Sequence, residues 1–267
     1  MRTLLLSATL LTVATAAIAM ANGPAVIQDQ VDPQQIIQKF AAKEADFREA
    51  RNNYTYRQTV KMEELDMGGN PNGGKWEEVD DIIFSPDGKR IEKVIYAPVI
   101  NLQHILLDPE DVKDLRDVQP FVLTTPDLPK YQIDYLGREK VDEIGCYTFS
   151  VKPKKMVKGE RYFEGEIWVD DRDFQIVKTL GKGVGIIGKD HQFPKFETYR
   201  EQIDGKYWFP TYTHADDTLH FKDSDQRIRM TVQYRDYKKY EGKSTIKFGS
   251  IVDDKKATTP PPATKKQ

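Results

Sequence analysis

Residues 131–180 constrain the fold most, because apolar and polar side chains alternate there in several short stretches. Cys146–Lys152 and Glu164–Asp170 both show this period of two residues. Such a period is typical of a strand with one buried face and one solvated face. Turn residues separate the stretches by only a few positions, so we expect sequence neighbours to pair antiparallel. The inward positions predicted here are Tyr147, Phe149, Val151, Ile167 and Val169.

Patterns on both sides extend the prediction. Asp32-Pro33 opens an amphipathic helix that should end near Asn52, and Asp108-Pro109 opens a short helix to about Val118. Glycines at 68–74 and 183–189 are predicted to lie in loops. The sequence therefore predicts a mainly β fold with a few helices, of the α+β class. Further strands are expected at Tyr54–Met62, Trp76–Phe84, Arg90–Tyr96, Phe196–Ile203, Lys206–Thr213 and Arg227–Tyr237.

The two ends of the sequence differ from the rest. Residues 1–21 have the charged start, apolar centre and A-x-A site of a secretory signal peptide. Residues 243–267 are rich in Lys and Pro, which is typical of a disordered tail. Between them, residues 25–242 are predicted to form a single domain. We therefore expect an exported protein, without a lipid anchor because no cysteine lies near the cleavage site.

Composition and motifs argue against several classes of function. Lys and Arg number 40 against 42 Asp and Glu, so nothing favours nucleic-acid binding. Gly183–Lys189 matches the start of a P-loop, but Asp190 and Pro194 follow where a nucleotide site needs Ser or Thr and a helix, so we predict no nucleotide partner. His214 and His220, expected on a loop, match no zinc spacing, and we predict no metal site and no cofactor.

A catalytic centre is equally hard to find. Cys146 is the only cysteine, so no internal disulfide can form, and its strand position suits a small filler better than a nucleophile. No serine-nucleophile motif is present. Acidic pairs such as Asp80-Asp81, Asp170-Asp171 and Asp216-Asp217 are expected at strand ends or turns. No catalytic residue is predicted; a secreted hydrolase that uses a carboxylate pair is the less favoured alternative.

Three stretches resemble the outer-membrane lipoprotein-sorting family, the LolA-like proteins: YLGREKVDEIGCYTFSVKPKK, GEIWVDDRDFQIVKT and YREQIDGKYWFPTYT. The resemblance covers about Val31–Tyr237. It implies a strongly curved antiparallel sheet, an unclosed half-barrel covered by helices, in a periplasmic protein. It also implies that the hollow carries a lipid or the acyl chains of a lipoprotein toward the outer membrane, with a transport component of the inner or outer membrane as a further partner. The matching positions are Gly137, Glu139, Val141, Tyr147, Val151 and Pro153, then Ile167, Trp168, Val169 and Asp170.

A cargo would lie on the apolar strand faces, with the segment around Phe121 and Leu123 as a lid at the mouth. The alternative is that these side chains form an ordinary core under the helices. The scaffold could also serve as an envelope sensing or protein-interaction module. The predicted cavity-lining residues are Tyr54, Tyr56, Phe121, Leu123, Tyr147, Phe149, Ile167, Val169, Met230 and Val232.

Overall fold

The computed structural model describes residues 32–239, except residue 86 and residues 187–190. The predicted signal peptide and C-terminal tail lie outside the described residues. From Pro33 onward the described chain belongs to one compact unit. No helix in its described part has both the length and the apolar character needed to cross a membrane.

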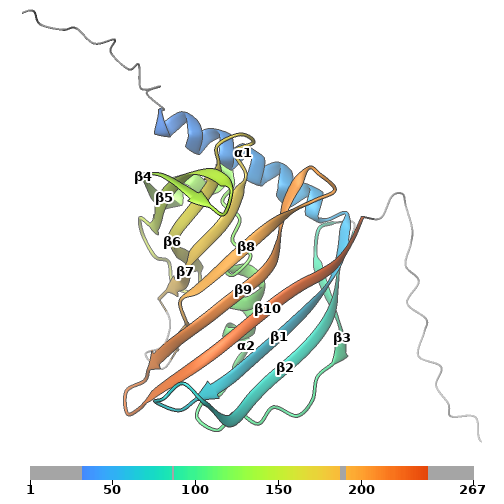
Figure 1. Ribbon diagram of the computed structural model, residues 1–267, viewed down its shortest axis with the longest axis vertical. Helices are drawn as coiled ribbons and strands as arrows, with labels where there is room; N and C mark the ends of the chain where they lie inside the picture. The colour runs from blue at the N-terminus through green and yellow to red at the C-terminus, as the bar shows by residue number, and fades with distance from the viewer. Residues whose placement is uncertain (1–31, 86, 187–190, 240–267) are drawn as a thin grey trace, which may run out of the picture. The chain divides into compact units, whose positions relative to one another are not determined.

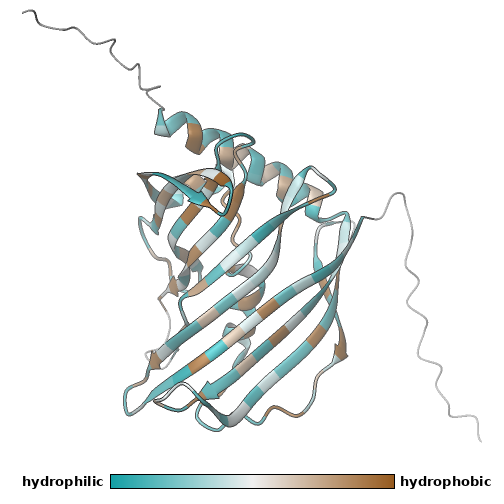
Figure 2. Ribbon diagram, in the orientation of Figure 1, coloured by the Kyte–Doolittle hydropathy of each residue, from teal (hydrophilic) through white to brown (hydrophobic). Residues whose placement is uncertain are grey.

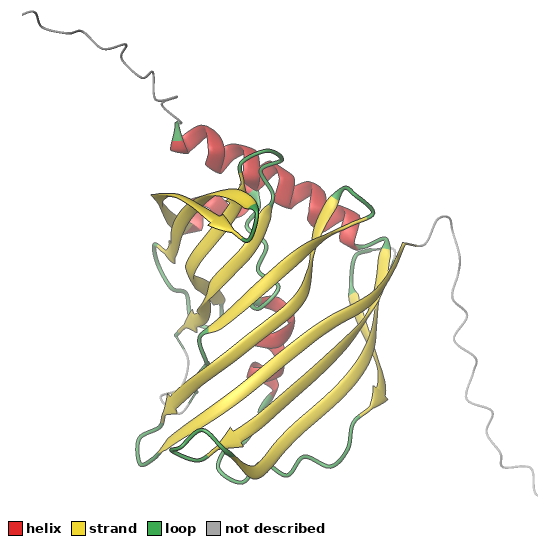
Figure 3. Ribbon diagram, viewed as in Figure 1, coloured by secondary structure: helices red, strands yellow, loops and turns green. Residues whose placement is uncertain are grey.

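Ten antiparallel strands form one sheet in the order β3-β2-β1-β10-β9-β8-β7-β6-β5-β4 (Figures 1 and 3). Every pairing joins sequence neighbours except that of β1 with β10. The sheet is not closed, since β3 and β4 are its two edges, and the mainly β prediction of an unclosed half-barrel is confirmed. The strands are β1 (Tyr54–Leu65), β2 (Pro71–Phe84), β3 (Arg90–Tyr96), β4 (Tyr131–Val141), β5 (Ile144–Pro153), β6 (Arg161–Asp170), β7 (Ile176–Gly185), β8 (Phe196–Ile203), β9 (Tyr207–His220) and β10 (Asp225–Lys239).

The alternation that predicted the strands is visible along the ribbons (Figure 2). In β1 every second residue from Tyr54 to Glu64 is buried. The β8–β9 hairpin turns at Asp204-Gly205, where both residues have a positive φ of 55° and 65°, as a two-residue turn of this hand requires.

Three predicted loops are shorter than expected. The strand predicted to stop at Thr213 continues to His220, because Ala215 and Leu219 keep the inward alternation going. His214 and His220 therefore lie on β9, and the loop prediction for them was wrong. Pro71–Gly74 belong to β2, and the glycines at 183 and 185 end β7.

Helix α1 (Pro33–Arg51) covers one part of the sheet, as predicted. Its apolar stripe packs aromatic rings onto the strands: Phe40 lies 5.6 Å from Phe149, and Phe47 lies 5.1 Å from Phe209. The same stripe contains Glu44, which is fully buried and accepts hydrogen bonds from Arg200 of β8 at 2.9 and 3.2 Å. A buried ion pair therefore fixes α1 on the sheet.

A second helix, α2 (Pro109–Asp117), and a short 3-10 helix, η1 (Thr125–Lys130), follow β3. The connection from β3 to α2, residues 97–108, is called the strap below. It runs beside β1 and β2, where Asn101 Oδ1 accepts the backbone N–H of Lys75 at 2.9 Å. The strap and α2 together cover the part of the sheet that α1 leaves (Figure 1).

The opposite face of the sheet carries a smaller core of Cys146, Trp168 and Val177. Burial raises the pKa of the Cys146 thiol to about 11, so the thiol stays protonated at neutral pH. This agrees with Cys146 as a filler of the packed interior.

Candidate functional site

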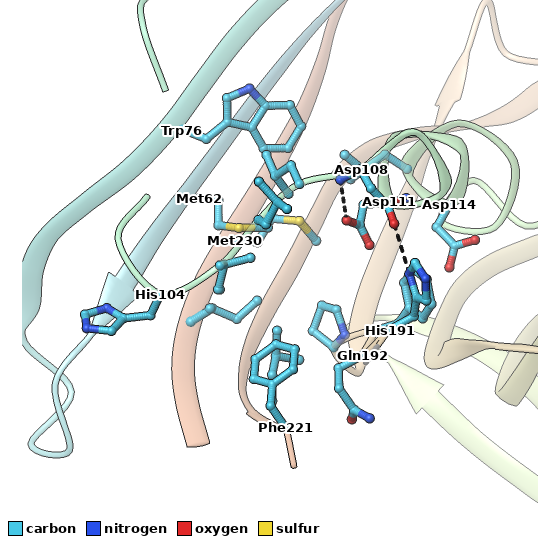
Figure 4. Close-up of a pocket in the computed structure, with 18 of the residues that line it drawn as sticks. Met62, Trp76, His104, Asp108, Asp111, Asp114, His191, Gln192, Phe221 and Met230 are labelled. Carbon is cyan, nitrogen blue, oxygen red and sulfur yellow. Dashed lines mark hydrogen bonds and ion pairs between the residues drawn. The ribbon is translucent and has the colours of Figure 1, made fainter. Parts of the chain in front are cut away.

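A cavity of about 340 Å³ with a mainly apolar lining, called the main cavity below, lies between the sheet and α2 (Figure 4). Four adjacent strands supply its apolar floor. Met62 of β1 pairs with Trp76 of β2 on one side and with Met230 of β10 on the other, so three large side chains meet on one face. Leu219 and Ile228 complete the floor, and Leu115 of α2 lies opposite.

The strap forms one wall, and a buried carboxylate holds its middle part on the sheet. Glu64 of β1 is fully buried and accepts the backbone N–H groups of Gln103, His104 and Ile105 at 2.8 to 3.0 Å. Burial acts to raise the pKa of Glu64, but these N–H groups outweigh it and hold the pKa below its usual value. The strap is therefore fastened to the sheet by an ionised buried group.

Helix α2 forms the second wall, and a reciprocal cap defines its start. The N–H of Asp111 donates to Asp108 Oδ1 at 3.0 Å, and the N–H of Asp108 donates to Asp111 Oδ2 at 2.8 Å. One turn on, Asp114 forms a buried ion pair with Arg161 of β6. Gln119, just after α2, is 5% exposed and lines the cavity.

Residues 191–194 close the third side. His191 Nδ1 lies 3.1 Å from Asp108 Oδ2, and the guanidinium of Arg161 lies 4.0 Å from the centre of the Phe193 ring. Asp108, Asp111 and His191 can each offer one ligand atom, and these atoms lie within 4.8 Å of one another. This is the group that could hold a metal ion among the described residues. The absence of a metal site stays a prediction.

All ten residues predicted to line a cavity are buried, with exposed fractions of 8% or less. Met230 lines the main cavity. Phe121 lines a separate hollow of about 150 Å³, where its ring stacks 4.3 Å from Phe163. Tyr54 packs on Phe209 beneath α1, and Phe149 is enclosed by Phe40 and Tyr135. Whether these side chains contact a ligand stays a prediction.

The segment expected to act as a lid is packed into the interior. Leu123 and Thr124 are fully buried, and the carbonyl oxygen of Phe121 accepts a hydrogen bond from Arg200. These contacts tie the segment to β8 and not to the rim of the main cavity.

The acidic pairs were predicted to lie at strand ends or turns, and for two of the three pairs this was wrong. Asp80-Asp81 lies inside β2, and Asp216-Asp217 lies inside β9. Asp216 accepts hydrogen bonds from both Arg227 and Arg229. Asp80 differs: its burial, with the charges of Glu78 and Glu92, raises its pKa to about 7.

Sequence reasoning missed most of the residues around the main cavity. Trp76 and Ile228 could have been found, because each stands in an alternating strand in register with Met62 or its neighbours. Leu115 and Gln119 could not, because nothing local to 109–119 shows which face of the sheet the helix covers.

No protein-family model and no curated protein sequence matches the chain. Among solved structures, it is similar to a DUF1329 family protein from Desulfovibrio piger, with 16% identity over 78% of this chain and 94% of that one at a TM-score of 0.42. It is similar to a domain from Vibrio parahaemolyticus described as an outer membrane lipoprotein-sorting protein (13% identity, 75% and 92% covered, TM-score 0.34). A LolA superfamily protein from Nitrosomonas europaea gives 13% identity, 79% and 94% coverage and a TM-score of 0.32. These structures include the family that the strand motifs resemble.

Proposed function

We propose that the protein is an exported, periplasmic binding or carrier protein that holds the apolar part of a lipid, or of an acylated lipoprotein, for transfer toward the outer membrane. The cavity between the sheet and α2 carries this proposal. A volume of about 340 Å³ falls within the roughly 300–1,000 Å³ of small-molecule sites. Its floor offers two Met, a Trp and aliphatic side chains, which suit a flexible hydrocarbon chain.

The proposal is tested by native mass spectrometry of protein freshly purified from the periplasm of a diderm host. We expect a bound lipid in the wild type and its loss in Leu219→Trp, because a larger side chain on the floor would occupy the cavity. Leu136→Trp is the matched control, since Leu136 is 54% exposed on the edge strand β4. A folded wild type that carries no lipid and takes up none when lipid is added would refute the proposal.

A second candidate function, an envelope sensing or protein-interaction module, rests on the other edge of the sheet. β3 and the start of the strap expose five apolar residues, here called the β3 strip. Each of them is at least 45% exposed. An edge strand has unpaired backbone groups, and a partner can add a strand to it. The β3 strip consists of Val94, Ile95, Tyr96, Val99 and Ile100.

The two candidates give different crosslinking results in cells. A photoreactive residue at Ile95 should yield one discrete protein adduct if the β3 strip docks a partner. The same residue at Leu136 of β4 is the control. Equal, diffuse labelling from both positions would rule out the interaction module.

Neither candidate requires catalysis, and we propose that the protein is not an enzyme. The histidines considered in the sequence have structural neighbours. His220 Nδ1 lies 2.9 Å from Asp225, and the His214 ring stacks on Tyr212 at 6.3 Å. They lie on β9 without a nucleophile beside them in the described contacts.

A further inference from the structure

The segment from Val94 to Leu107, which comprises the end of β3 and nearly all of the strap, contains no Asp, Glu, Lys or Arg. It is the longest run of this kind between residues 32 and 239, in a chain of which 31% is charged. Eleven large apolar side chains are exposed in the described part of the chain, and six of them lie in this run. Single exposed apolar residues are normal, but a contiguous group of them marks an interaction surface. The six are Val94, Ile95, Tyr96, Val99, Ile100 and Leu106.

This apolar run reaches the opening of the main cavity. Leu106 lines the cavity and is also 90% exposed, so its side chain lies at the opening. Asn101 of the strap donates to the carbonyl oxygen of Gly73 at 3.2 Å, which places the strap beside the β1–β2 hairpin. The turn of that hairpin exposes Met67 to 84%. Both the turn and the strap lie at the end of the sheet away from α1 (Figure 1). An apolar surface therefore continues from the cavity to the outside of the protein.

Part of the backbone of the strap already has its hydrogen bonds within the protein. Glu64 accepts the three consecutive N–H groups of residues 103–105, and the N–H of Asn101 donates to the carbonyl oxygen of Lys75 at 3.2 Å. An N–H group without an acceptor is costly in apolar surroundings. These four bonds lower that cost for the middle of the strap, while apolar side chains on both sides of it stay exposed.

We propose that this end of the protein docks on a lipid bilayer, with Met67, Val99 and Leu106 entering the boundary between head groups and acyl chains. Because the run has no charged side chain, none has to lose its hydration when it enters this boundary. The choice of a bilayer rests on the proposed function, in which the ligand of the cavity has an acyl chain. A chain that leaves the cavity at Leu106 would reach the acyl region of the membrane without exposure to water.

The charges beside the strap predict how docking depends on the lipid. The β1–β2 turn carries Asp66, and the β9–β10 turn carries Lys222 and Asp223. Anionic membranes attract clusters of Lys and Arg, and neither the run nor these two turns contain one. Docking should therefore depend on the apolar side chains. It should be as strong on neutral as on anionic bilayers and should resist salt.

The test is flotation with vesicles of phosphatidylcholine, alone or mixed with an equal amount of phosphatidylglycerol, at low and at high salt. We expect the wild type to bind both kinds of vesicle to a similar extent. Met67→Ser/Val99→Ser should weaken binding at least about tenfold, or about 1.4 kcal/mol. Neither residue lines the cavity, so the lipid content seen by native mass spectrometry should not change. Leu136→Ser/Val157→Ser, which changes two exposed side chains elsewhere, is the matched control and should bind like the wild type.

A fluorophore that is sensitive to its surroundings tests which part of the protein enters the membrane. Attached to Leu106→Cys, it should shift to shorter wavelength when vesicles are added. Attached to Leu136→Cys on the edge strand β4, it should not shift. The native Cys146 is buried and does not compete for the label.

The outcomes separate this inference from the proposed function. A wild type that holds lipid but does not bind vesicles, or a Met67→Ser/Val99→Ser variant that binds as well as the wild type, would overturn the inference and leave the carrier proposal intact. Binding that requires phosphatidylglycerol and is lost at high salt would also overturn it. A discrete protein adduct from a photoreactive residue at Leu106, without vesicle binding, would assign the surface to a protein partner instead. Vesicle binding by protein that neither holds nor takes up lipid would support docking and refute the carrier proposal.

Discussion

The buried ion pair between α1 and the sheet leads to an asymmetric prediction. Arg200 and Glu44 are 4% and 0% exposed, and their atoms approach to 2.9 Å. Removing one partner of such a pair leaves a buried charge and costs about 3–5 kcal/mol. The two partners differ in how they can escape that cost, because a carboxylate can take up a proton while a guanidinium cannot lose one.

Burial raises the pKa of Glu44, and the charge of Arg200 offsets only part of the rise. In Arg200→Met, the carboxyl is therefore expected to be protonated more readily in the folded state than in the unfolded one. The sign follows: stability of this variant is greatest below the unfolded pKa and falls as pH rises through the raised folded pKa. Its deficit should be small at pH 5 and approach about 3–5 kcal/mol at pH 8. Glu44→Leu should lose about 3–5 kcal/mol at both pH values.

The double variant Glu44→Leu/Arg200→Met should recover most of the loss. It leaves neither charge of this pair, and its remaining cost is about 1 kcal/mol for the hydrogen bond that Arg200 donates to the carbonyl of Phe121. Urea denaturation followed by circular dichroism at pH 5 and pH 8 measures all three variants. Lys61→Met is the control, since it removes an exposed pair with Glu77 at 3.0 Å and should change stability little. If the double variant is as unstable as the sum of the singles, or if Glu44→Leu is as pH-dependent as Arg200→Met, the reasoning fails.

Other changes test the remaining features. Phe149→Ala should cost about 3–5 kcal/mol in urea denaturation because the side chain is fully enclosed. Met230→Ala, on the cavity floor, should cost less and should lower lipid uptake. Equal losses of stability in both variants would place the two residues in one packed core. Asp80→Asn should stabilise the protein at pH 8, on the order of 1–2 kcal/mol, and not at pH 5. The pKa of the wild-type carboxyl is raised to about 7, so the wild-type protein loses stability as pH rises through that value. Thermal melts that shift equally at both pH values would contradict this. His214→Ala/His220→Ala should leave envelope function intact in a complementation assay, and a folded but inactive variant would point to catalysis.

Local patterns in the sequence are enough to predict most strands and α1. Alternation needs only neighbouring residues, and it locates Tyr54–Met62 and Cys146–Lys152 within the observed β1 and β5. The helix cap at Asp32-Pro33 works in the same way. The error at β9 arose because the polar residues His214 and 216–218 hid an alternation that Ala215 and Leu219 continue.

The cavity could not be predicted because contacts between distant residues define it. Glu64 bonds to N–H groups about 40 residues away, and nothing near Glu64 distinguishes it from the exposed acids of other strands. The position of the strap then decides which strand faces stay open. The predicted inward residues are buried as expected, but whether α1 or the strap covers them depends on such contacts.

The central pairing of β1 with β10 has a consequence for how the chain acquires its structure. Strand β10, the later member of that pair, ends at Lys239. The strands β3, β2 and β1 therefore have no further neighbour in the sheet until nearly the whole described chain is available. Contacts of such large sequence separation form slowly, because the loop between them must first be closed. Before its last strand is available the chain can therefore form only separate hairpins and meanders, and the sheet becomes continuous only when β10 pairs with β1.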